Sequence, residues 1–521
     1  MTAPSTIAVS GGRVAALGAS AAEVRAAAPD GADVLDFPGA CLLPGFWDTH
    51  VHVERVGLVA EGCELYTARS IAGIQEALAA LAAEQPGREV IYGRTGCLHP
   101  AVLEEGRLPT RRDLDEAVPD RPVVIHDVHK AFANTAALRA AGITAKTPDP
   151  AGGRLDRDPD GEPNGISWFR GGQALFDKLI ALRPSLGPGE YAEYYRKGCL
   201  RLAARGVTTV IQAYARNHQI GAIQKLDADG RLPCRSIVHP AAVRGNDYAE
   251  FLECPYEFGQ RLGELSHVGP LKLLYDLFIM HRTARVGRHY VDRPGDFGAY
   301  NTTPEELVER IHGAMTRGFP VGVHVTGDEG LDEAVAAIAA ETKALGESAP
   351  EGSFLIHGYF VSPGAPRRMA DLGLGLASQP VFHYAWADQV EEFVGTERAC
   401  DFYPYDRYLS AGVTIGGGSD AAVAWYDPLY GIYAATTRKS ASGRVWGPEH
   451  KVNPETAVSF FTDAAAGLVP WTGLSGKLEP GEPADFVVLD RDPRRTEGAG
   501  VLETKVLATY VSGREVYRAK E

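Results

Sequence analysis

Two histidines, His50 and His52, are separated by one residue just after the apolar segment 42–47. On a β-strand, residues i and i+2 point to the same face, so both imidazoles can reach one metal ion. A His-x-His pair also occurs by chance, or because the two histidines pack like other side chains without binding a metal. The case for a metal site therefore depends on the other residues that could act as ligands.

Two further histidines each close a short apolar segment: His324 follows 321–323 and His357 follows 354–356. They lie about one βα unit apart along the chain, so we expect them on neighbouring strands. Each stands at the C-terminal end of its strand, the rim where catalytic groups gather in (β/α)₈ enzymes. Either histidine alone fits an ordinary buried core position as well as a ligand.

Asp420 directly follows the strand-like segment 413–419 and provides a carboxylate at another strand end. There it could bind a metal ion. The alternative interpretation is a turn or helix N-cap residue, for which Ser-Asp is common.

Lys272 lies in the strand-like segment 270–276, on the face opposite Leu271 and Leu273. If the leucines face the surrounding helices, the lysine points into the barrel, where a buried ammonium tends to lose its proton. The neutral amine could take up CO₂ to form a carbamate that bridges two cations. The alternative is a core ion pair with Asp276.

The elements that must position these residues alternate between apolar strands and helices, which predicts a parallel α/β barrel. Thr303 and Glu306 form a capping box that opens a helix to about Thr316, and 331–345 is a second helical segment. Eight barrel strands are expected to begin near Leu43, Val207, Cys234, Pro270, Phe319, Ser353, Gly373 and Val413. By this count the candidate ligands lie at strands 1, 4, 5, 6 and 8 of one (β/α)₈ barrel.

Three regions are expected along the chain. Residues 1–42 and 468–521 are rich in strands and predict one composite β-sandwich domain built from both termini. Residues 43–467 form the barrel. The gap between the first two barrel strands is too long for one βα unit, so an insertion at about 65–185 is expected to cover the active site.

The composition is ordinary for a soluble globular protein with a large core. The net charge is −15, and an acidic surface repels phosphate backbones, so nucleic acid is not an expected partner. No apolar run approaches the ~20 residues that span a bilayer, and residues 1–10 lack a secretory signal. Seven cysteines without a CxxC pair fit the cytoplasm, and a homodimer is left open.

Taken together, the ligand pattern resembles the amidohydrolase superfamily, and more narrowly its YtcJ-like (amidohydrolase-3) branch, which includes N-substituted formamide deformylases. The resemblance rests on the His-x-His pair after Pro-Gly-Phe-x-Asp, the strand-4 lysine, the histidines on strands 5 and 6, and the aspartate on strand 8. Supporting segments lie at 108–122, 134–138, 324–328, 418–421, 427–429 and 476–490.

The chain departs from its relatives where a substrate would be contacted. The usual Gly-rich segment after the strand-4 lysine reads 276–283 here without glycine, the usual His-Ala-Gln reads His357-Gly358-Tyr359, and Glu329 replaces a common arginine. These changes spare every candidate ligand. The resemblance therefore says more about mechanism than about substrate.

The resemblance implies that His50, His52 and Asp420 hold one divalent metal ion, and that His324 and His357 hold a second. Carboxylated Lys272 would bridge them, and a mononuclear site using some of these ligands is the nearest variant. Zinc is the default metal for such ligands, with manganese and iron as alternatives. Asp420 would act as the general base, with Lys272 as the second catalytic residue.

The expected reaction is hydrolysis of an amide-like C–N bond that is not a peptide bond, in an N-acyl or N-formyl amide, a cyclic amide or a carbamate. The alternatives are non-hydrolytic chemistry at the same metal site (decarboxylation, C–C cleavage or isomerisation) and a catalytically silent binding protein. Loops after the strands are expected to contact the substrate through His281, Arg282, Tyr359, His383, Trp386 and Trp425. The same side chains could instead cap the barrel core.

Overall fold

Eight parallel strands form the main sheet of the protein, a nearly closed barrel, and a ninth short strand, β13 (Ser266–Val268), pairs with β12. The computed structural model describes residues 6–96, 98–127, 130–150, 153–169, 187–243 and 245–520. The barrel strands, in spatial order, are β4 (Phe46–Val51), β11 (Val207–Ala215), β12 (Arg235–Ala242), β14 (Leu271–Leu274), β15 (Val321–Val325), β16 (Phe354–His357), β17 (Gly375–Ser378) and β18 (Ile415–Gly417). The predicted (β/α)₈ barrel is confirmed.

The barrel closes where β18 meets β4. The backbone N–H of Asp420 donates to the carbonyl oxygen of His50 at 2.7 Å. Across the same seam the carboxylate of Asp48 accepts hydrogen bonds from the backbone N–H of Ser419 at 2.9 Å and from its hydroxyl at 2.5 Å. The first and last strands are therefore joined beside two of the candidate ligands.

Helices surround this barrel and bury their apolar faces against the strands in one continuous core. They are α2 (Val53–Val59), α7 (Pro188–Ala203), α8 (Asn217–Ala228), α9 (Asp247–Leu252), α10 (Pro304–Thr316), α11 (Asp328–Leu345), α12 (Ala365–Asp371), α13 (Pro380–Val394), α14 (Thr396–Cys400), α15 (Tyr405–Ser410), α16 (Pro428–Thr437), α17 (Pro454–Ser459) and α18 (Asp463–Ala466). The capping box predicted for α10 is present: Thr303 Oγ accepts from the backbone of Glu306 at 3.2 Å, and the Glu306 carboxylate accepts in return at 2.9 Å. None of the helices in the described ranges is both long and apolar enough to cross a membrane.

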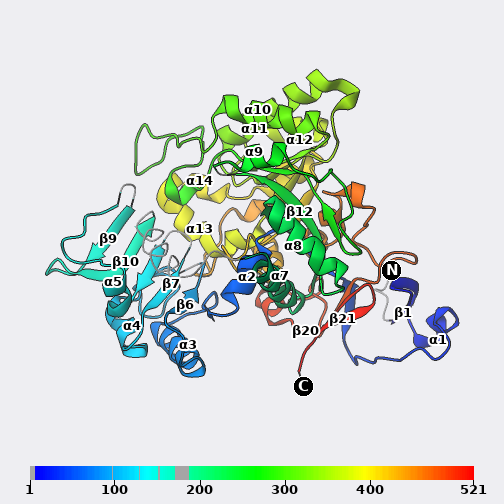
Figure 1. Ribbon diagram of the computed structural model, residues 1–521, viewed down its shortest axis with the longest axis horizontal. Coiled ribbons are helices and arrows are strands. Elements are labelled where there is room, and N and C mark those ends of the chain that lie inside the picture. Colours follow the sequence, from blue (N-terminus) through cyan, green and yellow to red (C-terminus); the bar gives the residue numbers. More distant parts are fainter. Residues whose placement is uncertain are drawn as a thin grey trace.

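Between β4 and β11 the chain builds a separate six-stranded sheet with its own apolar core (Figure 1). Its strands are β5 (Cys63–Glu64), β6 (Ile91–Arg94), β7 (Val123–His126), β8 (Lys130–Ala133), β9 (Gly153–Arg157) and β10 (Pro163–Phe169), and α3 (Ile71–Glu84), α4 (Arg111–Ala117) and α5 (Thr135–Ala140) accompany them. The sheet touches the loop after β18: Arg94 Nε donates to the carbonyl of Ala422 at 2.5 Å, and Tyr66 Oη donates to the same oxygen at 3.2 Å. Residues 170–186, which include the end of the predicted insertion, lie outside the described residues.

Strands from both ends of the chain pair with one another on the other side of the barrel (Figure 1). A four-stranded antiparallel sheet contains β3 (Cys41–Pro44), β19 (Phe486–Leu489), β20 (Val506–Val511) and β21 (Arg514–Arg518), and a hairpin of β1 (Thr6–Ser10) and β2 (Arg13–Gly18) packs on it through a shared apolar cluster. The run expected to be one strand from Leu43 is two strands, because the chain passes from β3 to β4 at Gly45. A Cβ there would lie 2.2 Å from Thr208 Cγ2, so the crossing requires glycine. Residues 1–5 and 521 lie outside the described residues.

Two glycines allow the close approach of α2 to α7, and this contact fixes the chain just after the first histidine pair. A Cβ at Gly57 would lie 1.8 Å from the carbonyl oxygen of Tyr194, and one at Gly198 would lie 2.0 Å from that of Val53. Backbone atoms cannot move aside as a side chain can. The helix that begins directly after His52 is thus held by backbone-to-backbone contact.

The substitution Gly57→Ala should therefore destabilise the protein by about 1–3 kcal/mol, the range for an overpacked core. Helix propensity alone would favour alanine by about 1 kcal/mol, so any loss must come from the collision. The midpoints of thermal and denaturant unfolding measure the effect. The matched control is Gly189→Ala in α7, where a Cβ meets nothing within 4 Å. Equal midpoints for the two variants would contradict the packing argument.

Candidate functional site

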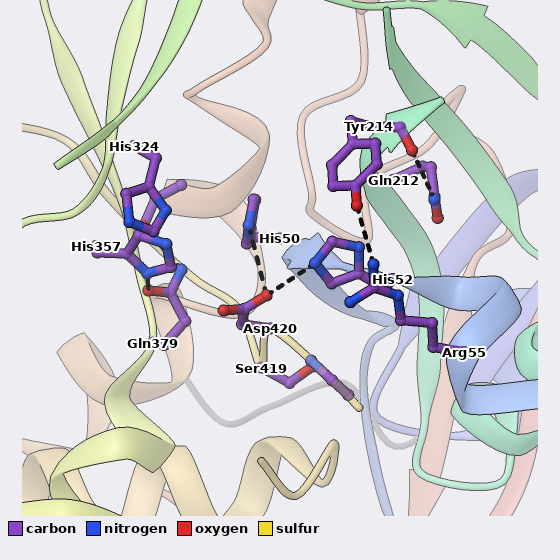
Figure 2. Close-up of polar contacts among 12 residues, drawn as sticks. His50, His52, Arg55, Gln212, Tyr214, His324, His357, Gln379, Ser419 and Asp420 are labelled. Atoms are coloured by element: carbon purple, nitrogen blue, oxygen red, sulfur yellow. Dashed lines mark hydrogen bonds and ion pairs between the residues drawn. The ribbon is translucent and has the colours of Figure 1, made fainter. Parts of the chain in front are cut away.

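All six candidate ligands are buried, and five of them lie at, or next to, the C-terminal ends of barrel strands. None is more than 7% exposed. His50 lies in β4 and His52 directly follows it, Lys272 lies in β14, His324 in β15, His357 ends β16, and Asp420 follows β18. Figure 2 shows the four histidines arranged around Asp420.

The tightest group consists of His50, His357 and Asp420. Each offers one ligand atom, and these atoms lie within 4.8 Å of one another. Asp420 Oδ1 lies 3.6 Å from His50 Nε2 and 3.3 Å from His52 Nε2, as the dashed lines in Figure 2 indicate. One carboxylate therefore faces both histidines of the first pair.

His324 joins this group through His357, since the centroids of the two rings are 4.1 Å apart. Its Nε2 lies 3.3 Å from the carbonyl oxygen of Leu277. The structure thus brings the histidines of strands 1, 5 and 6 to one place. How they would be divided between two metal ions stays a prediction.

Lys272 is fully enclosed, and its Nζ has no hydrogen-bond partner among the described residues. Asp276, the ion-pair partner considered above, instead accepts backbone N–H groups from Thr326 at 2.8 Å, Gly327 at 2.9 Å and Arg285 at 3.0 Å. Burial lowers the pKa of Lys272, while the negative charge of Asp420 opposes this shift. The lysine is therefore positioned as a buried amine without a counter-ion in contact.

The same burial keeps the histidines neutral. It is the largest cause that lowers the pKa of His50, His324 and His357 well below the ordinary value, and the charge of Lys272 adds to the effect in each case. Neutral imidazoles offer a lone pair to a metal ion, whereas protonated ones repel it.

These groups fit a divalent transition metal. Within the described residues, His50 Nδ1, His357 Nε2 and Asp420 Oδ1 are buried without a hydrogen-bond partner. Polar atoms that remain unpaired inside a protein are costly unless another group satisfies them. Neutral nitrogen and carboxylate oxygen donors are the set that zinc prefers.

Two of the ligands have unusual backbone conformations. His357 has φ of 79° and Asp420 has φ of 51°, in the left-handed region that few non-glycine residues adopt. Each sits where its strand turns sharply into a loop. Such conformations cost of order 1–3 kcal/mol and persist where the surrounding structure enforces them, often at functional sites.

Some residues that hold the ligands in place were missed by the sequence reasoning. Gln379, directly after β17, lies with Oε1 2.5 Å from His357 Nδ1 and orients that ring. Asp48 accepts the backbone N–H of His50 at 3.2 Å in addition to its bonds to Ser419. Gln379 follows the strand-end rule, since it comes directly after the strand between those of His357 and Asp420, whereas Asp48 lies within β4, two residues before His50.

Three of the expected substrate contacts are enclosed by the protein. Trp386 donates its indole N–H to the carbonyl oxygen of Gly96 at 2.6 Å, and His383 Nε2 lies 3.1 Å from the carbonyl oxygen of Arg438. Tyr359 differs, because its hydroxyl has no partner in the described part of the chain and its ring lies 5.6 Å from that of His357. His383 Nδ1 is likewise without a hydrogen-bond partner among the described residues, but of the two rings the structure places that of Tyr359 beside His357.

The other three expected contacts lie in the surrounding loops. His281 packs against Phe278, whose ring lies 5.8 Å from that of His324. Arg282 donates from Nε to Asp292 at 2.7 Å and lies over the ring of Phe393. Trp425 lies between the inserted sheet and the barrel, 5.0 Å from the ring of Tyr66, with the guanidinium of Arg205 at 4.9 Å.

Comparison with known proteins agrees with this geometry. The model of the family described as "Amidohydrolase family" matches residues 33–517. The amidohydrolase YtcJ of Bacillus subtilis is 29% identical, with 92% of this chain and 89% of that protein covered. The N-substituted formamide deformylase of Arthrobacter pascens is 28% identical, with 97% and 93% covered.

Solved structures give the same result. A metal-dependent hydrolase from Pyrococcus horikoshii superposes with a TM-score of 0.69 at 25% identity, and the match covers 94% of each chain. One from Pyrococcus furiosus also gives 0.69, at 26% identity, over 94% of this chain and 95% of that chain. The family model spans nearly the whole chain, including every candidate ligand, so this protein is a hydrolase that belongs to the amidohydrolase family.

Proposed function

We propose that this protein is a metal-dependent hydrolase that cleaves an amide-like C–N bond of a small molecule: an N-acyl or N-formyl amide, a cyclic amide or a carbamate. The observation that carries the proposal is the convergence of His50, His357 and Asp420 at one buried point of the barrel rim. The name of the Arthrobacter relative, a deformylase of N-substituted formamides, supports this bond type.

His50, His52, His324, His357 and Asp420 would hold one or two divalent ions, with zinc as the expected metal. A bound divalent metal lowers the pKa of water towards ~7 and polarises the scissile carbonyl. Burial of the ligands keeps bulk water away from their unpaired atoms, which strengthens electrostatic interactions at the site.

Asp420 is positioned to move the proton. Burial raises its pKa above the ordinary carboxyl value, and the charge of Lys272 opposes this shift. A carboxylate of raised basicity can accept a proton from the attacking water and return it to the leaving amine nitrogen. Tyr359, with its unpaired hydroxyl beside His357, is proposed to contact the substrate.

A substrate screen tests the proposal directly. Zinc-loaded protein is incubated with N-formyl amides, N-acyl amides, cyclic amides and carbamates, and the released amine is measured. Release of amine from at least one class is expected. No release from any class, with zinc confirmed on the protein, would contradict the proposed bond type.

Purified protein should carry one or two transition-metal ions per chain, and a chelator should abolish turnover. Elemental analysis before and after dialysis gives the metal content, and re-addition of zinc should restore activity. Protein that is free of metal and fully active in chelator would overturn the proposal.

The substitution Asp420→Asn should keep the fold and lower turnover by roughly 10²-fold or more, the usual loss when a general base is removed. Because Asp420 is also a proposed ligand, the metal content of the variant must be measured alongside its rate. The matched control is Asp371→Asn on α12, whose side chain is 56% exposed. Near-native turnover in Asp420→Asn would leave Asp420 as a turn residue.

If Lys272 carries a carbamate, Lys272→Ala should lose metal, and short carboxylic acids should partly restore it by supplying the two missing oxygens. Lys272→Arg should not bind the bridged metal, because a guanidinium stays charged and cannot take up CO₂. Metal content and turnover of both variants are the measurements. An arginine variant that binds metal and turns over like the parent would show that the lysine is structural.

A further inference from the structure

A positively charged side chain, that of Arg55, lies beside the candidate metal site and has no part in the proposed mechanism. Arg55 is in the first turn of α2, three residues after His52. The ring of Tyr214 lies 5.2 Å from that of His52, and Tyr214 Oη accepts a hydrogen bond from Arg55 Nη2 at 2.9 Å. Figure 2 shows Arg55 on the His52 side of Asp420, away from His324 and His357.

The guanidinium is held in place but is not neutralised by close contact. Within the described part of the chain its one ion-pair partner within 4 Å is Glu54, and the Nε–Oε1 distance of 3.7 Å is too long for a hydrogen bond. Glu54 instead accepts from Gln212 Nε2 at 2.8 Å through its other oxygen. The Arg55 side chain remains 44% exposed.

A second arginine reinforces the positive character of this side. Arg94 Nε donates to the carbonyl of Ala422, two residues after Asp420, and its Nη1 lies 2.5 Å from His126 Nδ1. Burial lowers the pKa of Arg94, and the charge of Arg55 adds to this effect, so the two cations are close enough to interact. The guanidinium of Arg94 is thus occupied by contacts within the protein, whereas that of Arg55 keeps N–H donors available for a ligand.

We propose that Arg55 binds a carboxylate of the substrate, so that the natural substrate is an N-acyl or N-formyl amino acid or a similar amide bearing a carboxylate close to the scissile bond. The planar guanidinium fork matches a carboxylate in two parallel hydrogen bonds. Tyr214 contacts both Arg55 and His52, so a carboxylate bound to the guanidinium would lie on the His52 side of the candidate metal site (Figure 2). This inference rests on the proposed hydrolase function.

A purely structural role predicts something different. If Arg55 only balances the charge of Glu54, its removal should lower stability or affect all substrates equally. If it binds the substrate, its removal should affect only substrates that carry the anion. The ratio of kcat/KM between charged and uncharged partners separates the two roles.

The experiment compares N-formyl derivatives of phenylalanine, leucine and alanine with the matching formamides that lack the carboxylate. With zinc-loaded parent enzyme, the acid should be favoured in kcat/KM by roughly 10- to 100-fold, mainly through KM, as expected for charge-assisted hydrogen bonds. In Arg55→Met this ratio should fall to about one while the neutral formamides keep their rates. Arg55→Lys should retain part of the preference, because it keeps the charge and loses the fork.

The matched control is Arg367→Met on α12, whose side chain is 77% exposed and which should keep the full ratio. Melting temperature and zinc content show whether each variant is folded and loaded. Calorimetric binding of the same pairs to Asp420→Asn, with the zinc content of that variant measured in parallel, provides a readout that does not require hydrolysis.

The outcomes separate the two hypotheses. Amine release without preference for the acid, or a preference that survives Arg55→Met, overturns the role of Arg55 and leaves the proposed hydrolysis standing. Preferential binding of the acid that depends on Arg55, without any amine release, supports the carboxylate site and contradicts the bond type. Equal binding of acid and neutral partner in the calorimeter also overturns the role of Arg55.

Discussion

The short hydrogen bond from the backbone N–H of Asp420 to the carbonyl of His50 joins the last barrel strand to the first. The bonds from Ser419 to Asp48 lie beside it and are buried, so they are protected from competition with water. Because the bonded residues are themselves candidate ligands, closure of the barrel and assembly of the site are one structural event. The positive φ of Asp420 fits this requirement, since the chain must turn at that residue to direct its carboxylate inward.

Burial then determines the chemical state of the site. It favours neutral imidazoles and a neutral lysine, and it makes a carboxylate more basic. Water would undo each of these effects. The inserted sheet contributes at this point, because Arg94 and Tyr66 bind the loop that follows Asp420 and cover it from one side. None of the described residues of the inserted sheet is a candidate ligand. The sheet nevertheless supports the electrostatics of the site, because it covers part of the barrel rim.

The barrel could be predicted from sequence because each strand is a short apolar run and every candidate ligand except Lys272 stands at or beside the end of one. Gly45 shows the limit of this reasoning, since a continuous apolar run is divided there between two sheets by contact with Thr208. Contacts between distant segments could not be foreseen in the same way. Trp386 bonds to Gly96, and Arg55 reaches Tyr214, which is 159 residues away along the chain. Residue type predicts that a side chain is polar, whereas its partner depends on the tertiary fold.

The wide spacing of the ligands along the chain has a consequence for biosynthesis. At translation rates of roughly 5–20 residues per second, about 20 to 70 s pass between synthesis of His50 and of Asp420. During that interval the first histidine pair has no partner across the seam, and β3 waits longer still for β19. A metal site built from these residues would therefore form only after the barrel is complete. During that interval the edge of β4 that faces β18 in the finished barrel has no neighbouring strand.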